Sequence, residues 1–259
     1  MNKSKIEWLD GGYTWNPVTG CLHGCEYCYA RKIARRFSKS GYFEGTIHEL
    51  FDPNKLSGLR GDPFPYSFDP TFHRYRLDEP QKIKKPQNIF VCSMADLFGE
   101  WVPDEWIQQV FEACEKAPWH RYLFLTKNPD RYIELVGKGL LPKEINYWFG
   151  TTATTKSDHA FWSLERNYFI SIEPLMMDFS DCDFEAERIG GARIWPGWVI
   201  VGAETGNRKG KVIPKREWIE NIVSECRKQN VPVFLKDSLA KIWGEPLIRE
   251  YPWREKVCQ

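Results

Sequence analysis

Three cysteines within eight residues, Cys21, Cys25 and Cys28, constrain this chain more than any other feature. They form the spacing C-x3-C-x2-C, and Trp15-Asn16-Pro17 precedes them. Three thiolates on one short loop can hold three irons of a cubic [4Fe-4S] cluster, because soft sulfur donors suit iron, and the fourth iron is then left without a protein ligand. The sequence therefore predicts these three cysteines as metal ligands, with an open iron at which chemistry can occur.

Two other interpretations of the three thiols remain. His23 lies between two of them, so a mixed Cys/His zinc site is conceivable, although a closed structural zinc site needs four protein ligands and no second C-x2-C pair completes it. A disulfide framework fits less well. The other five of the eight cysteines are scattered singly and no signal peptide is recognisable, which is typical of proteins in a reducing cytosol.

Length and charge favour a globular enzyme. At 259 residues the chain can form one α/β barrel, and we expect a single domain over residues 1–259. No apolar run is long enough to cross a bilayer, so we expect a cytoplasmic protein with no membrane partner. With 36 basic and 35 acidic residues the net charge is +1, and a nucleic-acid site would have to be a local patch.

A helix is predicted directly after the cysteine loop, over residues 29–37. Ile33 and Phe37 stand at four-residue spacing on one face of this helix, and basic residues occupy the others. The basic residues are either an ordinary solvated surface or a contact for an anionic cofactor or substrate: Arg31, Lys32, Arg35 and Arg36.

Residues 41–86 differ from the rest of the chain. They are rich in proline, glycine and aromatic residues and show no sustained periodicity. Because long segments of this kind inside a compact domain are uncommon, we expect an irregular insertion that covers the mouth of a site.

Strands and helices alternate from residue 88 onward, which indicates a parallel sheet flanked by helices. Helices are expected to begin at Pro103 and Pro129 and to span residues 215–229. Strands are expected at 89–92, 122–125, 147–150, 169–172, 198–202 and 231–235. The count fits an α/β fold with a partial or complete (β/α) barrel, of the TIM type, with about six to seven parallel strands.

Polar residues follow most of these strands. In a (β/α) barrel the carboxyl ends of the strands form the active face, so we expect these residues to converge above one mouth. The strand-end residues are Asp96, Thr126, Lys127, Thr151, Glu173, Glu204 and Lys236. A surface charge or an ion pair is the structural alternative for each of them.

The cysteine spacing, with the aromatic Tyr27 before the last cysteine, resembles the signature of radical S-adenosylmethionine (radical SAM) enzymes. In that superfamily the open iron binds the amino and carboxylate groups of SAM. The resemblance implies a [4Fe-4S] cluster and S-adenosyl-L-methionine as cofactors, together with a reductant such as flavodoxin or ferredoxin. It also implies that SAM is cleaved reductively to methionine and a 5′-deoxyadenosyl radical, which abstracts hydrogen from a substrate.

Several longer segments together resemble one phage- and prokaryote-borne family of radical SAM-like proteins whose function is largely unassigned. The matching segments are 16–21, 90–98, 125–129, 172–175 and 201–206. Other radical SAM enzymes place Gly-Gly-Glu after the second strand to hold the amino group of SAM, and this chain has Ser93-Met94-Ala95-Asp96 there. The cofactor-binding residues that the resemblance and the strand-end rule select are Ser93, Asp96, Lys127, Thr151, Glu173, Glu204 and Lys236.

The resemblance predicts a radical SAM enzyme whose substrate is a nucleic acid or nucleotide, with the basic helix after the cysteine loop as a phosphate contact. A non-catalytic iron–sulfur or zinc protein, which transfers electrons or binds a partner, is the alternative. The lack of a second cysteine group argues against an electron relay between two clusters.

Overall fold

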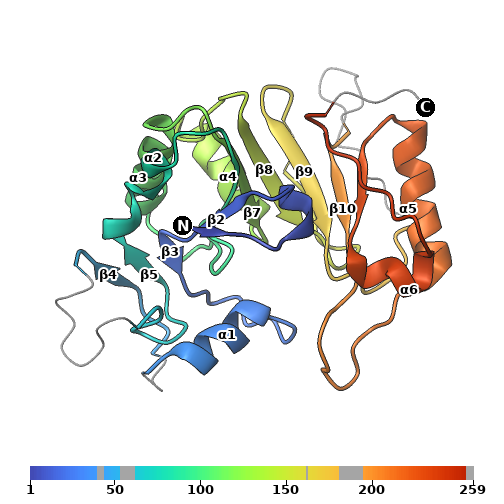
Figure 1. Cartoon of the computed structure of the whole chain (residues 1–259), viewed down its shortest axis with the longest axis horizontal. Coiled ribbons are helices and arrows are strands. Elements are labelled where there is room, and N and C mark those ends of the chain that lie inside the picture. The colour runs from blue at the N-terminus through green and yellow to red at the C-terminus, as the bar shows by residue number, and fades with distance from the viewer. Residues whose placement is uncertain (40–43, 53–61, 162, 181–194, 255–259) are drawn as a thin grey trace. The chain divides into compact units, whose positions relative to one another are not determined.

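A computed structural model of the chain describes residues 1–39, 44–52, 62–161, 163–180 and 195–254 (Figure 1). By the contacts that its residues make, the chain divides into two compact units. Unit 1 comprises residues 1–5 and 9–147, and unit 2 comprises residues 6–8 and 148–259. Both are mixed α/β structures, and the expected single domain over residues 1–259 stays a prediction.

The larger row of strands in unit 1 has the order β1-β2-β6-β7: β1 (Asn2–Lys3), β2 (Tyr13–Trp15), β6 (Asn88–Val91) and β7 (Arg121–Thr126). Strand β1 is antiparallel to β2, whereas β2, β6 and β7 are parallel. Helix α3 (Asp104–Glu115) follows β6 and α4 (Pro129–Gly137) follows β7. Phe111 of α3 packs on Phe124 of β7 with ring centroids 5.4 Å apart. The carboxyl ends of β2, β6 and β7 therefore lie at one edge.

A small second sheet in unit 1 has the order β3-β5-β4: β3 (Val18–Thr19), β4 (His48–Leu50) and β5 (Thr71–His73). A 3-10 helix at Arg74–Arg76 and α2 (Glu79–Lys82) follow β5. Short strands and helices thus occupy part of residues 41–86, and an insertion there that covers the mouth of a site stays a prediction. Residues 41–43 and 53–61 of the predicted insertion lie outside the described residues.

Helix α1 (Tyr29–Phe37) has the predicted bounds, and it buries a different face from the one that carries Ile33 and Phe37. Its buried residues are Ala30 and Ala34, which pack with Phe64 and Phe68. Ile33 and Phe37 share a face, as expected, yet they are 37% and 54% exposed. Periodicity locates an apolar stripe on a helix, and it does not show whether the rest of the fold covers that stripe.

Unit 2 contains four parallel strands in the order β8-β9-β10-β11: β8 (Tyr147–Thr152, of which Tyr147 belongs to unit 1), β9 (Asn167–Ile172), β10 (Val199–Val201) and β11 (Val233–Leu235). Its helical segments are α5 (Arg216–Lys228), a 3-10 helix at Asp237–Leu239 and α6 (Ala240–Trp243). A further 3-10 helix spans Glu7–Leu9. Because the four strands run in one direction, their carboxyl ends also share an edge.

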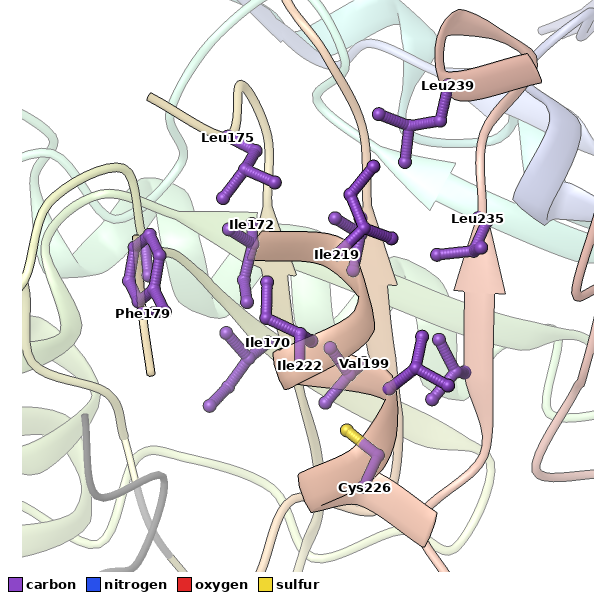
Figure 2. Packing of buried hydrophobic residues seen from close by; sticks show 14 of the residues in the cluster. Ile170, Ile172, Leu175, Phe179, Val199, Ile219, Ile222, Cys226, Leu235 and Leu239 are labelled. Atoms are coloured by element: carbon purple, nitrogen blue, oxygen red, sulfur yellow. The ribbon is translucent and has the colours of Figure 1, made fainter. Parts of the chain in front are cut away.

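The core of unit 2 forms between α5 and its parallel strands (Figure 2). Ile219, Ile222 and Cys226 of α5 recur at three- and four-residue spacing, which places them on one helix face. Figure 2 shows this face packed against side chains of the strands, namely Ile170, Ile172, Val199 and Leu235. Burying an aliphatic side chain of this size contributes about 1.5–3 kcal/mol, so this contact orders the strand ends that follow.

The expected alternation of strand and helix is wrong between β8 and β9, where residues 153–161 and 163–166 contain no helix. Asp158 provides the physical reason. Its Oδ2 accepts hydrogen bonds from the backbone N–H groups of Thr154 (2.6 Å) and Thr155 (2.9 Å), and local side-chain bonds of this kind compete with helix formation.

The strands and the long helices agree with the sequence predictions. Three strands of the β1-β2-β6-β7 row and all four strands of unit 2 run parallel to a neighbour, and so do β4 and β5 of the small sheet. The strands of each unit form an open row, so closure into a barrel stays a prediction. No helix in the described part of the chain is long and apolar enough to cross a membrane.

Candidate functional site

The cysteine loop begins at Gly20, where only glycine fits. Its φ is +86°, and a Cβ atom at this position would lie 2.1 Å from the carbonyl oxygen of Asp69. The N–H of Gly20 donates to the Met94 carbonyl at 2.9 Å, and the N–H of Cys21 donates to the Phe68 carbonyl at 3.1 Å. The first bond fixes the start of the loop to the segment that follows β6, at the carboxyl edge of the strands of unit 1, and the second fixes it to the segment that precedes β5.

The three thiols of the loop, Cys21, Cys25 and Cys28, are free and half-buried. The pKa of Cys21 is raised to about 12, chiefly because burial disfavours the thiolate. A backbone hydrogen bond at His23 opposes this shift, and the negative charges of Asp96, Cys28 and Cys25 add to it. The thiol groups are therefore close enough to interact, and Cys21 stays protonated at neutral pH unless a metal ion stabilises its thiolate.

Helix α1 begins at the last cysteine of the loop. Cys28 is its N-cap residue, and the Cys28 Sγ atom accepts a hydrogen bond from the backbone N–H of Arg31 at 3.3 Å. A helix N-terminus carries partial positive charge, so this position stabilises a thiolate. The loop thus delivers its third sulfur atom to the electropositive end of a helix.

The side chain of Arg31 runs from the third cysteine back to the first. Its Nη2 atom donates to the Cys21 carbonyl at 3.4 Å, and its guanidinium lies 5.4 Å from the centroid of the Phe68 ring. The Nε atom of Arg31 is buried and has no hydrogen-bond partner among the described residues. Cys21 and Cys28 also pack against the apolar cluster that includes Phe68. A buried N–H donor beside three thiols fits an anionic iron–sulfur cluster, whose sulfur atoms accept hydrogen bonds.

Asp96 joins the cysteine loop to the ends of two strands. Its Oδ2 atom accepts hydrogen bonds from Thr126 Oγ1 (3.0 Å) and from the N–H of Lys127 (2.9 Å), and its Oδ1 atom accepts one from the N–H of Phe98 (3.0 Å). The Nε2 atom of His23 lies 2.7 Å from Oδ2, and it is the donor because an ionised carboxylate only accepts. This buried carboxylate therefore holds His23 of the loop on the ends of β6 and β7.

Ser93 and Lys127 lie beside the same loop. Ser93 Oγ donates to the side-chain oxygen of Asn16 at 3.2 Å, and the Ser93 carbonyl accepts from the Tyr29 hydroxyl at 2.7 Å. The Nζ atom of Lys127 lies 5.3 Å from the centroid of the Tyr27 ring, in a cation–π contact. Three of the residues predicted to bind a cofactor, Ser93, Asp96 and Lys127, are thus brought together around the cysteine loop.

The other four predicted residues lie in unit 2. Lys236, directly after β11, forms an ion pair with Glu173, directly after β9. A Cβ atom on Gly202 would meet the Lys236 side chain at 2.9 Å and that of Glu173 at 3.3 Å, so this glycine makes room for the pair. An ion pair between a carboxylate and an ammonium group therefore lies at the carboxyl edge of unit 2.

Glu204 and Thr151 are more deeply placed. Glu204 is 8% exposed, and its two oxygens accept from Nε (2.7 Å) and Nη2 (2.8 Å) of Arg208 in a two-point ion pair. The Oγ1 atom of the buried Thr151 accepts from the N–H of Phe161 at 3.2 Å. That the four residues of unit 2 face the cysteine loop stays a prediction.

A site for a single metal ion requires several side chains that converge on one point. Among the described residues, no group of three or more His, Cys, Asp and Glu side chains is arranged to hold a metal ion. Ligands of one zinc ion must converge on a point about 2.0–2.3 Å away, whereas the thiolates of a cubic cluster each bind a different iron. The donor set fits a cluster: three thiols, a helix N-terminus and a buried N–H donor.

The profile of a protein family described as "Protein of unknown function (DUF5131)" matches residues 3–249. The chain belongs to this family. No curated protein matches the chain.

Among solved structures, this DUF5131 protein is similar to a cysteine-to-serine mutant of spore photoproduct lyase. The TM-score is 0.50 and the sequence identity is 10%, and the match covers 90% of this chain and 78% of the lyase chain. At this identity the similarity shows the fold alone, which is a mixed α/β fold with mostly parallel strands.

Sequence reasoning missed three partners in this DUF5131 chain. Asn16 accepts hydrogen bonds from Ser93 Oγ and from the backbone of Met94, and the sequence marked it only as part of the matching segment 16–21, with no role. His23 was assigned only to a zinc alternative, whereas it binds Asp96. Arg208 pairs with Glu204, and the sequence carries no signal for this pair, because these residues lie in a non-helical segment where four-residue spacing does not bring side chains together.

Proposed function

We propose that this protein is a radical SAM enzyme in which Cys21, Cys25 and Cys28 hold a [4Fe-4S] cluster. The observation that carries the proposal is the grouping of three free thiols on one loop, capped by the N-terminus of α1, in a chain with a radical SAM-like α/β fold. A reducing compartment such as the cytoplasm suits a site of three thiolates, and a small reductant such as flavodoxin or ferredoxin would supply electrons.

When bound together, a reduced cluster and SAM provide the hard chemistry, which is cleavage of SAM to methionine and a 5′-deoxyadenosyl radical that abstracts hydrogen from a substrate. The chain's own residues bind and orient these groups. Arg31 donates its backbone N–H to Cys28 and places its buried Nε beside the loop, where both favour the charged thiolate form. Asp96 keeps His23, and with it the middle of the loop, on the strand ends.

Polar residues beside the loop are the first candidates to bind SAM. Lys127 offers an ammonium group suited to a carboxylate, and Ser93 offers a hydroxyl oxygen that can accept while its proton is donated to Asn16. Asp96 has both carboxylate oxygens engaged inside the protein, so its predicted contact with the SAM amino group requires one of these bonds to be shared. From unit 2 we keep Thr151, Glu173, Glu204 and Lys236 as proposed SAM or substrate contacts. The proposed substrate class is a nucleic acid or nucleotide.

The test is anaerobic reconstitution of the full chain with iron and sulfide, followed by dithionite and SAM. The proposal predicts about four irons and four sulfides per chain and slow release of 5′-deoxyadenosine even without substrate. The matched controls are Cys21→Ala, which should lose both properties, and Cys114→Ala, which should keep both.

Two outcomes would contradict the proposal. A protein that takes up zinc and no iron would support a zinc-binding interaction protein. A protein with a complete cluster that neither binds SAM nor cleaves it under strong reduction would support electron transfer instead.

A further inference from the structure

We propose that the exposed face of α1 is a docking surface for a single strand of nucleic acid, leading to the cysteine loop. We call it the α1 face, and it consists of Tyr29, Lys32, Ile33, Arg35, Arg36 and Phe37. The inference rests on the proposed function in that it names the substrate class of the same site, but the binding it predicts can be measured without any reaction.

Three large apolar side chains line the α1 face. Tyr29, Ile33 and Phe37 are 51%, 37% and 54% exposed, and their four-residue spacing places them in a row along the helix. The helix rests on the fold through the small residues Ala30 and Ala34. Single exposed apolar residues are ordinary, but a row of three on a helix that buries only alanines indicates a surface made for contact.

Positive charge is concentrated on the same helix. Residues 28–39 contain five basic residues and no acidic residue, in a chain whose net charge is +1. Lys32, Arg35 and Arg36 are exposed, and no carboxylate in the described part of the chain forms an ion pair with them. The local excess of charge is therefore available to neutralise a polyanion.

The combination of aromatic rings and cations favours a single strand over an anionic lipid surface. The guanidinium of Arg36 lies 5.5 Å from the centroid of the Phe37 ring, so a cation and a stacking surface stand side by side. Single strands are bound in this way, because their unpaired bases stack on aromatic rings while basic groups contact phosphates. A membrane-surface helix instead needs a broad apolar face to insert, and nine residues with one narrow row do not provide it.

The length and direction of α1 fit this role. Nine residues at about 1.5 Å each make a helix about 13 Å long, which is the axial length of about four nucleotides of one strand. The N-cap of the helix is Cys28, so a strand lying along the α1 face reaches the proposed cluster site at one end. Figure 1 shows α1 in blue at the periphery of unit 1.

The test measures binding of a fluorescein-labelled thymidine single strand of about twelve nucleotides to the reconstituted full chain by fluorescence anisotropy, over a range of salt concentrations. The triple variant Lys32→Glu/Arg35→Glu/Arg36→Glu should weaken binding more than tenfold and lower the slope of log K against log salt by about 2. Phe37→Ala should weaken binding about tenfold with little change in slope, because it removes stacking and not charge.

A matched control shows whether strand affinity depends on the charges of the α1 face or on the total charge of the protein. Lys82→Glu/Lys84→Glu/Lys85→Glu makes the same charge change at exposed lysines elsewhere in unit 1, and its affinity should stay within about twofold at moderate salt. Circular dichroism checks that each variant is folded.

Three results would overturn the inference: no strand binding by the unmodified protein, equal losses in the two triple variants, or binding to phosphatidylserine vesicles without binding to the strand. Strand binding together with absent SAM cleavage would contradict the proposed enzyme and leave the α1 face intact. SAM cleavage without strand binding would support the proposed enzyme and contradict the docking role of the α1 face.

Discussion

Cysteines in the cysteine loop and in the core of unit 2 have different neighbouring residues, and the neighbours determine whether a cysteine can bind a metal. Cys226 lies on α5 inside the core of unit 2, and burial raises its pKa to about 12. Burial raises the pKa of Cys21 in the cysteine loop to about the same value. The difference is that Cys21 interacts with two further thiols, Cys25 and Cys28, whereas Cys226 packs among aliphatic side chains.

This comparison shows that burial alone does not make a metal ligand. An isolated buried thiol behaves as a small apolar group, and Cys114 on α3 is a second example, with a pKa well above its ordinary value because of burial. Grouped thiols with N–H donors nearby gain from ionising together once a metal is present.

Removal of a loop thiol should have the largest effect. Replacing Cys21, Cys25 or Cys28 by alanine leaves two ligands for a cluster that needs three, so we expect iron to fall from about four per chain to below about one after desalting. Iron and sulfide analysis with the visible spectrum measures this. A Cys28→Ala protein that keeps its full iron content would contradict the distinction between metal-binding cysteines in the loop and isolated cysteines in the core.

Removal of the carboxylate that holds the loop should come next. In Asp96→Asn the amide NH2 group faces N–H and O–H donors, so we expect the free energy of unfolding to fall by about 3 kcal/mol and the cluster to be lost faster on exposure to air. Urea denaturation and the decay of the visible absorbance measure the two effects. The matched control is Asp78→Asn at an exposed ion pair, which should change stability by less than about 1 kcal/mol. Equal effects in the two variants would show that Asp96 does not hold the loop.

Replacement of a carboxylate that is not a metal ligand should weaken SAM binding and leave the iron content unchanged. Glu173→Gln or Glu204→Gln removes a charged hydrogen-bond acceptor at the carboxyl edge of unit 2, and we expect SAM to bind about tenfold to hundredfold more weakly, equivalent to about 1.5–3 kcal/mol, with iron content unchanged. Isothermal titration of the reconstituted protein measures the affinity, and Glu217→Gln on the exposed part of α5 is the control. Unchanged SAM affinity in both variants would remove these residues from the proposed site.

Core cysteines should have the smallest effect. Cys114→Ala or Cys226→Ala leaves a small cavity that costs about 1 kcal/mol of stability, and we expect no loss of iron. Thermal unfolding and iron analysis test the two parts separately. Iron loss in a stable, folded Cys226→Ala protein would contradict the contrast.

The parallel strands and long helices could be predicted because apolar periodicity and strand-end turns are local in the sequence. The Cys28 end of α1 was predicted for the same reason. The contact of His23 with Asp96 could not be predicted, because it joins residues 73 positions apart and depends on how the loop folds over the strand ends. The exposure of Phe37 could not be predicted, because the spacing of apolar residues on a helix does not show whether other parts of the fold cover them. The segment after β8 was misjudged because Asp158 forms local bonds in place of a helix.

The central claim is that the three thiols of the cysteine loop hold a cluster with an open iron that binds SAM. Electron paramagnetic resonance of the reconstituted, dithionite-reduced protein, recorded with and without SAM, tests it most directly. We predict the signal of a reduced cubic cluster that shifts when SAM is added, and its absence in Cys21→Ala. A cubic-cluster signal that is identical with and without saturating SAM, or one that persists in Cys21→Ala, would contradict the account.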